Sequence, residues 1–179
     1  ATDITDRKEM ELALKEAHAK ARAAALEDDL TGLHNRRAFF ELGNQLLKQT
    51  RRNGSPLAII MFDLDHFKQI NDNHGHDAGD EVLRHVGRVL VSNVREADIA
   101  ARIGGEEFAI LLADAQTPQA SELAERLLSV MQKTPVRYHD VRIRPTASFG
   151  ISALHPEEPN LKNLLARADS AMYESKALG

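Results

Sequence analysis

Two apolar runs separated by two glycines and two glutamates constrain the fold of this chain most strongly. Residues 101–112 read Ala-Arg-Ile-Gly-Gly-Glu-Glu-Phe-Ala-Ile-Leu-Leu. Isoleucine, leucine and phenylalanine suit strands, and glycine tolerates the positive φ of tight turns. The segment therefore predicts a β-hairpin whose tip presents the carboxylates of Glu106 and Glu107 beside bare backbone. On this segment alone, an ordinary exposed turn with solvated acids is the alternative.

A second group of carboxylates follows another predicted strand. Residues 57–62 form a continuous apolar run, as buried strands do, and Asp63-Leu64-Asp65-His66-Phe67-Lys68 comes next. Carboxylates at a strand end, near a second acidic pair on a hairpin, form an all-oxygen site suited to Mg²⁺. Lys68 lies where it could meet a phosphate. Asp65 could instead cap the short helix that we expect after it.

Composition limits the possible functions. The 179 residues are 42% hydrophobic, which is enough for one domain with a core. The net charge of −4 argues against bulk binding of nucleic acid, which needs a basic face. The absence of cysteine excludes disulfides and thiolate metal sites and is compatible with a cytoplasmic location. We see no run of 18 apolar residues and no signal peptide, so we expect no membrane segment within this stretch.

Hydrophobic periodicity places the remaining elements. We expect Thr117 to cap a helix that has Pro118 at its first position. Interleaved helices and strands around an antiparallel hairpin predict an α+β fold with helices packed on a sheet. The expected helices are 7–27, 38–49, 66–73, 80–93, one from 117, and 161–178, and the expected strands are 57–62, 99–103, 107–112, 138–144 and 146–153.

The first predicted helix has the spacing of a coiled-coil seam, with apolar residues at Met10, Leu14, Ala17, Ala21 and Ala24. Three of these five are alanines, so the seam buries little and would associate weakly. The functional interpretation is a signalling linker that sets the distance between two catalytic domains. A single solvated helix is the alternative.

Three separated motifs together resemble the GGDEF family of diguanylate cyclases. They are Phe-Asp-Leu-Asp-His-Phe-Lys at 62–68, Gly-His-Asp-Ala-Gly-Asp at 75–80 and Gly-Gly-Glu-Glu-Phe at 104–108. The resemblance covers about residues 28–179, and glutamate at the first acidic position is a common variant. It implies a ferredoxin-like palm shared with nucleotide cyclases and polymerases, with a mostly antiparallel central sheet flanked by helices. It also implies condensation of two GTP into cyclic di-GMP with release of two pyrophosphates.

The resemblance further divides the chain into parts. Residues 3–8 resemble the last strand and exit of a PAS sensor domain, so residues 1–6 are expected to be a PAS tail on a longer sensor protein. Residues 7–27 would be the linker and 28–179 the catalytic domain. Beyond Gly179 the family pattern continues into Arg-Asn, and that arginine is not in this chain.

The resemblance also implies roles for individual residues. Asp63, Glu106 and the Leu64 carbonyl are expected to hold Mg²⁺ or Mn²⁺, two ions per active site. Glu107 would bind metal or activate the 3′-hydroxyl. The phosphate contacts would come from Lys68, from the backbone amides of His66 and Phe67, and from Lys176.

The guanine base would be bound by Asn71 and Asp80. Guanine presents a ring N–H and an amino group side by side, and one carboxylate can accept both. Adenine lacks that pair, which predicts a preference for GTP over ATP. Without the neighbouring motifs, Asn71 would be interpreted as a turn residue and Asp80 as a helix N-terminal charge.

Arg95 and Asp98 match the Arg-x-x-Asp inhibitory site of the family, where the product binds. Arg126 matches a further arginine that contacts the product, with an ordinary helix-surface position as the alternative. The implied partners are GTP, cyclic di-GMP as product and feedback inhibitor, and a second copy in a catalytic homodimer. Two other functions stay open: an inactive module that binds GTP or cyclic di-GMP, and a dimerisation and signalling module acting through residues 7–27.

Overall fold

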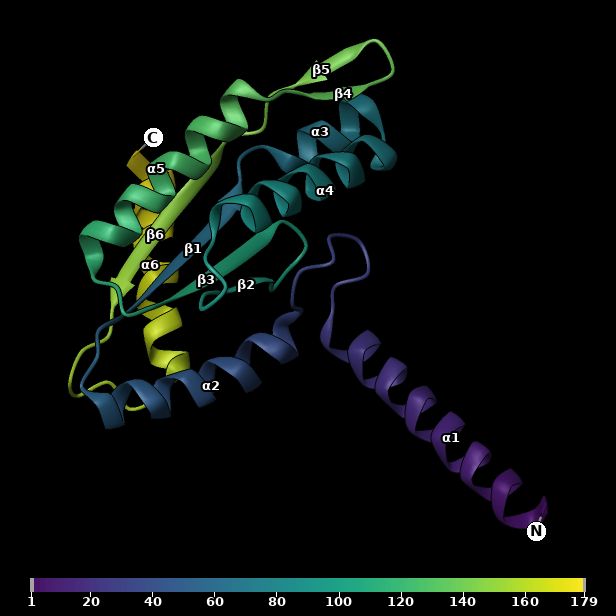
Figure 1. Cartoon of the computed structure of the whole chain (residues 1–179). Coiled ribbons are helices and arrows are strands. Elements are labelled where there is room, and N and C mark those ends of the chain that lie inside the picture. Colours follow the sequence, from purple (N-terminus) through teal and green to yellow (C-terminus); the bar gives the residue numbers. More distant parts are fainter. Residues whose placement is uncertain (1, 179) are drawn as a thin grey trace.

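A four-stranded antiparallel sheet with the strand order β2-β3-β1-β6 is the centre of the structure, a computed structural model that describes residues 2–178. The predicted interleaving of strands and helices is confirmed (Figure 1). The helices are α1 (Thr2–Leu26), α2 (Arg36–Asn53), α3 (Phe67–His74), α4 (His76–Asn93), α5 (Thr117–Lys133) and α6 (Leu161–Leu178). The strands are β1 (Leu57–Leu64), β2 (Ile99–Arg102), β3 (Glu107–Ala113), β4 (Val136–Tyr138), β5 (Val141–Ile143) and β6 (Ala147–Ala153).

Strand β1 runs between β3 and β6, and all of its residues are buried. Successive side chains of a strand point to opposite faces of the sheet. Ile60 and Phe62 accordingly join one core with α4 and α5, whereas Ile59 and Met61 join a second core with α2 and α6. Helices cover both faces, which is why β1 is a continuous apolar run rather than an alternating one.

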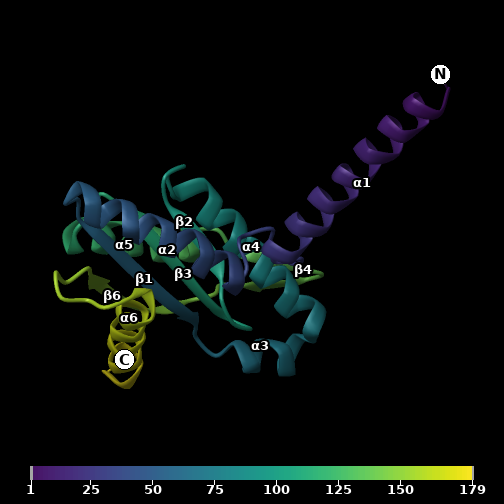
Figure 2. The ribbon, with the colours of Figure 1, turned by 90° about the horizontal axis from the view of Figure 1, so that it is seen from below.

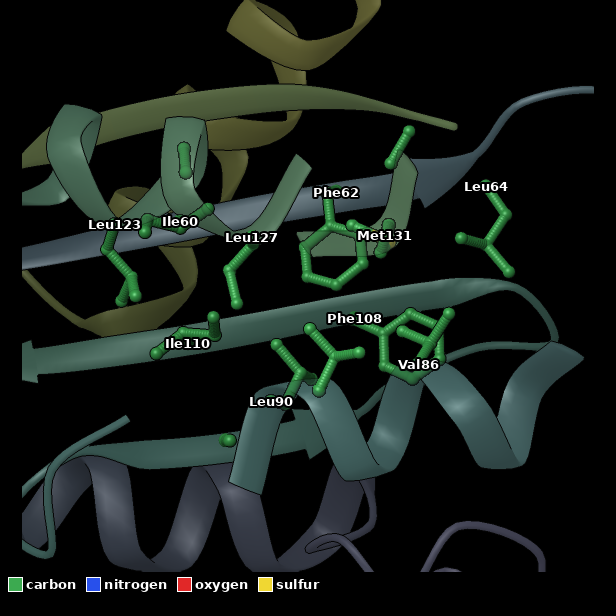
Figure 3. Close-up of a cluster of buried hydrophobic side chains, with 14 of the residues drawn as sticks. Ile60, Phe62, Leu64, Val86, Leu90, Phe108, Ile110, Leu123, Leu127 and Met131 are labelled. Carbon is green, nitrogen blue, oxygen red and sulfur yellow. The ribbon is translucent and has the colours of Figure 1, made fainter. Parts of the chain in front are cut away.

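The core against α4 and α5 is built around two stacked phenylalanines. The rings of Phe62 in β1 and Phe108 in β3 lie 5.0 Å apart between centroids and 11° from parallel (Figure 3). Val86 and Leu90 of α4 and Leu127 of α5 close over them. This packing fixes the two strands that carry the acidic residues.

On the opposite face, α6 lies very close to β6. Gly150 of β6 is buried, and a Cβ atom there would overlap the Ala168 carbonyl oxygen and the Met172 backbone nitrogen of α6. Glycine is thus required at this position by the approach of two backbones. The close contact sets where the end of α6 lies relative to the sheet.

Helix α1 extends away from the body of the molecule (Figures 1 and 2). The predicted helix is confirmed and begins at Thr2, so it also includes residues 2–6, for which the PAS-tail interpretation stays a prediction. Asp3 in the first turn is favourable beside the helix N-terminus. Met10 and Leu14 of the predicted seam are 72% and 57% exposed; the side chain of Ala24 lies outside those described. Within residues 2–178 we find no helix with the length and hydrophobicity to cross a bilayer.

Two local predictions are wrong. Residues 138–144 are not one strand, because β4 and β5 pair as a hairpin whose turn includes His139 at φ 53°. The N-cap residue of α5 is Gln116 rather than Thr117, and the Gln119 side chain accepts a hydrogen bond from the Gln116 N–H at 2.9 Å. The hairpin lies beside α3 and α4 in Figure 1.

Candidate active site

Strand β1 carries Asp63 to the end of the sheet where the candidate site lies. Asp63 has the same parity as Met61, so its side chain faces the α2 and α6 side. The antiparallel register sets Glu107 of β3, rather than Glu106, directly opposite Asp63. Like charges directly opposite each other on one sheet face repel. The fold therefore gathers negative charge at a point where a cation would be favourable.

The Glu107 carboxyl responds to this crowding. Burial raises its pKa above the ordinary value, and the nearby charges of Asp63, Asp169 and Glu106 raise it further. Arg36 at the start of α2 acts in the opposite direction. A carboxylate with a raised pKa accepts a proton more readily than an ordinary one, as a group that deprotonates a hydroxyl must do.

Lys176, near the end of α6, lies on the other side of Asp63. Its ammonium donates a hydrogen bond to Asp63 Oδ2 at 2.7 Å. The sequence predicted a phosphate contact for Lys176; here its partner is the carboxylate expected to bind metal. The second oxygen, Asp63 Oδ1, is buried without a hydrogen-bond partner.

The tip of the β2–β3 hairpin differs from the prediction in its backbone. Neither Gly104 nor Gly105 has a positive φ. A Cβ at Gly104 would lie 2.9 Å from Glu107 Oε2, whereas a Cβ at Gly105 would meet no atom within 4 Å. The glycines therefore leave room at the tip, one for a carboxylate and one for solvent or a ligand.

Arg102 braces the same tip and was not singled out in the sequence. Its Nε and Nη2 donate to the Gly105 carbonyl at 3.0 and 2.8 Å, and its Nη1 donates to Asp28 Oδ1 at 3.0 Å. Asp28 in turn accepts from the hydroxyl and backbone N–H of Thr31. A single arginine at the end of an apolar strand was the only signal for this role.

Asp65 secures the end of β1 rather than capping a helix, so the alternative prediction for it is wrong. Its carboxylate accepts hydrogen bonds from Thr146 Oγ1 at 2.9 Å and Ser148 Oγ at 2.7 Å. Its backbone N–H donates to the Thr146 carbonyl. These bonds tie the segment after Asp63 to β6.

The expected phosphate-binding segment opens α3. His66 occupies the N-cap position in the left-handed conformation with φ 55°, and no side chain caps this helix. Phe67 is buried and anchors the turn, whereas Lys68 is exposed. A helix N-terminus without a side-chain cap leaves amide donors that suit a phosphate group.

The expected base-binding residues come from two adjoining helices. Asn71 lies in α3 and Asp80 lies one turn into α4, and both are half-buried. The Asn71 carbonyl accepts from the Gly75 N–H at the joint between the helices. Asn71 Oδ1 is buried without a hydrogen-bond partner.

The donor set fits a hard cation. Within the described residues 2–178 there is no group of three or more histidine, aspartate or glutamate side chains arranged to hold a metal. Mg²⁺ nevertheless uses only one or two protein carboxylates when substrate phosphates supply the other ligands. The Leu64 N–H donates to the Glu106 carbonyl at 3.2 Å, which keeps the Glu106 backbone beside the end of β1. The few protein ligands that Mg²⁺ needs are available here. Asp63 has an oxygen without a hydrogen-bond partner, and Glu106 and Leu64 adjoin it.

Residues 25–179 match the family described as "Diguanylate cyclase, GGDEF domain". The chain belongs to the GGDEF family. The family resemblance of the sequence and the cyclase palm fold are thereby confirmed.

Relatives of this GGDEF domain are longer proteins. Cyclic di-GMP phosphodiesterase NbdA of Pseudomonas aeruginosa is 41% identical over 166 residues, which are 93% of this chain and 21% of NbdA. Response regulator PleD of Caulobacter vibrioides is 41% identical over 157 residues, or 87% of this chain and 35% of PleD. The chain thus spans between about a fifth and a third of these relatives.

Two solved structures resemble the GGDEF domain closely. The coiled coil and GGDEF domain of DgcB from Caulobacter crescentus, in complex with c-di-GMP, matches with a TM-score of 0.94 and 28% identity over 99% of this chain and 94% of that one. The active GGEEF domain of a diguanylate cyclase from Vibrio cholerae matches with a TM-score of 0.76 and 32% identity over 81% and 92%. The first shares the position of the helix that precedes the domain.

The structure brings together the residues expected at the inhibitory site of the GGDEF domain. Arg95 Nη2 donates to Asp98 Oδ1 at 3.0 Å and to the Ala113 carbonyl at 2.6 Å. Both Arg95 and Asp98 line a cavity of about 390 Å³ that also includes His34. Arg126 is not among its lining residues; it donates to the side chain and carbonyl of Asn93 at the end of α4.

Proposed function

We propose that this GGDEF domain is a diguanylate cyclase that condenses two GTP into cyclic di-GMP and two pyrophosphates. The observation that carries the proposal is the position of two buried side-chain oxygens that lack a partner among the described residues, Asp63 Oδ1 and Asn71 Oδ1. An unpartnered buried polar atom is destabilising and needs an explanation. One lies at the expected metal end and the other at the expected base end of a single substrate site.

Asp63, Glu106 and the Leu64 carbonyl would hold a Mg²⁺ or Mn²⁺ ion, with two ions expected when substrate is bound. The ion supplies a Lewis acid for the α-phosphate and neutralises part of the triphosphate charge. Lys68 and the amides of His66 and Phe67 add fixed positive charge for the phosphate chain. These groups favour the extra negative charge of the transition state.

Glu107 is suited to take the proton of the attacking 3′-hydroxyl. Burial raises its pKa, so it is a stronger base than a solvated carboxylate. Gly105 leaves open space at the hairpin tip, as a nucleotide approaching the tip requires. Lys176, which donates to Asp63 here, would be available to a phosphate oxygen with Asp63 engaged by an ion.

Asp80 and Asn71 would select guanine. The Asp80 carboxylate accepts the ring N–H and the amino group, and the Asn71 amide can donate to a guanine acceptor. Each domain holds one GTP in this arrangement, so the second GTP must come from a second copy of the chain. The proposed partner is therefore a homodimer whose two sites face each other.

The test is incubation of the chain with GTP and Mg²⁺, followed by chromatography for cyclic di-GMP and an assay for pyrophosphate. We expect both products from wild type and neither from Asp63→Asn or Glu106→Gln, since loss of one such interaction typically lowers turnover about 10²-fold or more. Circular dichroism shows whether each variant remains folded.

The same assay separates the cyclase from a binding module. A wild-type chain that binds GTP but forms no product would support the inactive module and contradict the cyclase. The name of NbdA shows that a relative can carry a matching segment in a protein named for the opposite reaction. Near-normal turnover by folded Asp63→Asn would contradict the assignment of Asp63.

A further inference from the structure

Gly79 occupies a helix position that has no backbone need for glycine. It lies in α4 and does not have a positive φ. In such a position alanine would favour the helix more than glycine does. The reason for glycine must therefore be sought in the space around it.

That space is filled by Asn71. A Cβ at Gly79 would overlap Asn71 Oδ1, and it would lie 3.0 Å from Asn71 Cγ and 3.2 Å from Phe67 Cζ. The backbone fixes the position of a Cβ atom, and Gly79 is buried, so the added atom could not avoid these contacts. The glycine leaves the gap between α3 and α4 into which the Asn71 amide fits.

The amide oxygen gains no hydrogen bond in this gap, because Asn71 Oδ1 is buried without a partner. A helix-weakening glycine and an unpartnered oxygen thus coincide at one contact. Helix propensity does not favour the glycine, and hydrogen bonding does not favour the buried oxygen; such departures concentrate at functional positions. Because the amide group is planar, a wedged oxygen also fixes the direction of the nitrogen, which is its hydrogen-bond donor.

We propose that Gly79 is a positioning residue for base recognition, which acts by holding the Asn71 amide in the orientation that donates to guanine. The proposal rests on the proposed function of the GGDEF domain, since it assumes that Asn71 binds the base. Guanine offers O6 and N7 as acceptors, whereas adenine has an amino group in place of O6. An amide rotated away from O6 would therefore weaken binding of guanine and leave binding of adenine, which has no acceptor at that position, unchanged.

The experiment is a double-mutant cycle with four proteins: wild type, Gly79→Ala, Asn71→Ala and the double variant. Calorimetry with Mg²⁺ measures binding of 3′-deoxy-GTP and 3′-deoxy-ATP, which lack the attacking hydroxyl and do not turn over. Gly87→Ala is the matched control, since Gly87 is also a buried glycine of α4, but its Cβ would approach Thr31 at 3.0 Å instead. Thermal unfolding of each protein is recorded in parallel.

We expect Gly79→Ala and Asn71→Ala each to weaken 3′-deoxy-GTP binding about tenfold while leaving 3′-deoxy-ATP unchanged. In the Asn71→Ala background, Gly79→Ala should weaken guanine binding no further and should raise the unfolding temperature. Gly87→Ala should lower the unfolding temperature and leave the preference for guanine intact.

Two results would overturn the proposal: guanine binding by Gly79→Ala as tight as in wild type, or an equal loss in both Asn71 backgrounds. If Gly79→Ala alone fails to fold, folding of the double variant supports the Asn71 contact, and failure of both overturns it. A wild-type chain without guanine preference would refute the proposed function together with this inference. Guanine preference in wild type with an additive cycle would refute the inference alone.

Discussion

The ion pair between Lys176 and Asp63 places a cation of the chain beside an expected metal ligand. The Lys176 side chain is 37% exposed and that of Asp63 12%, so the pair is only partly screened by solvent. It offsets the repulsion between Asp63 and the facing Glu107. A metal ion arriving at Asp63 must compete with this ammonium.

Lys176→Met should therefore tighten binding of Mn²⁺ to the nucleotide-free protein. A partly exposed pair contributes up to about 1 kcal/mol, which corresponds to about a fivefold change in Kd. Electron paramagnetic resonance of free Mn²⁺ measures the change directly. Lys133→Met, on α5 at the opposite face, should have no effect, and unchanged or weaker binding by Lys176→Met would contradict the competition.

His85 is a half-buried residue whose protonated form is disfavoured in the folded protein. Burial lowers its pKa below the usual 6.5, and the nearby Arg88 lowers it further, whereas the contact with Thr134 acts in the opposite direction. The neutral form is favoured in the folded protein, so the unfolded chain binds a proton more readily. The contribution to stability is present above about pH 6.5 and is lost as the pH falls through the folded pKa.

His85→Asn should remove this dependence, because asparagine stays uncharged. Urea unfolding at pH 7.5 and 5.5 tests this: wild type should lose more stability on acidification than the variant. His18→Asn, at an exposed position of α1, should behave as wild type does. Equal acid sensitivity in wild type and His85→Asn would show that protonation of His85 does not matter to folding.

At the scale of elements, the approach of α6 to β6 places Lys176. Helix α6 meets the sheet where Gly150 has no side chain. Because backbone atoms of Ala168 and Met172 occupy the space, an added methyl group cannot be accommodated by rotating a side chain.

Gly150→Ala should therefore destabilise the domain by about 3 kcal/mol or more, the upper end for overpacking, and lower Tm by about 6–12 °C. Gly105→Ala is the control, since a Cβ there meets nothing within 4 Å. Calorimetric unfolding gives both values. A Gly150→Ala protein as stable as the control would mean that α6 moves away from the sheet at little cost.

Elements with strong periodicity could be predicted from the sequence, and those defined by distant contacts could not. The bounds predicted for the last helix equal those of α6, because its start and its apolar spacing are local features. The β4–β5 turn escaped prediction because His139 adopts a left-handed conformation that glycine or asparagine would have signalled.

In the candidate site, too, residues with a local sequence signal could be predicted, and contacts between distant parts of the chain could not. Three carboxylates stood out because they flank apolar strands, Asp63 at the end of β1, Glu106 just before β3 and Glu107 at its start. The 113-residue separation between Lys176 and Asp63 left their contact without any local signal. Gly79 also carried too little information alone, since its role depends on the packing of α3 against α4.

At the scale of the whole molecule, α1 presents exposed apolar residues that would suit the proposed second copy. Met10 and Leu14 of the predicted seam are exposed, and so is Leu12, which lies off the seam. Alanines complete most of the seam, so association should be weak. If two copies must meet for turnover, specific activity should rise with protein concentration.

Leu14→Ala should shift that rise to higher concentration, because it removes one of the few large apolar residues of the seam. Leu12→Ala is the matched control, with a similar exposed leucine of the same helix, and should leave the curve unchanged. Initial rates over a hundredfold range of concentration provide the test. A rate per chain that is constant in wild type would contradict the need for two copies.

Regulation by product would involve both the segment between α4 and β2, which carries Arg95 and Asp98, and the end of β3. Arg95 closes on Asp98 and on the end of β3, so cyclic di-GMP would have to open this pair. Arg95→Ala should relieve product inhibition and change the initial rate little. Progress curves with and without added cyclic di-GMP measure both effects. A strong fall in the initial rate would instead assign Arg95 to holding β3.

The central position of β1 has a consequence for how the domain opens and refolds. Its partners, β3 and β6, come from distant parts of the chain, and such non-local pairing slows folding. Backbone amides of β1 should exchange with deuterium only when the whole domain unfolds, whereas α3 and the hairpin tip can open locally. At the proposed site, a nucleotide would then be released through brief local openings while the strand that presents Asp63 remains protected.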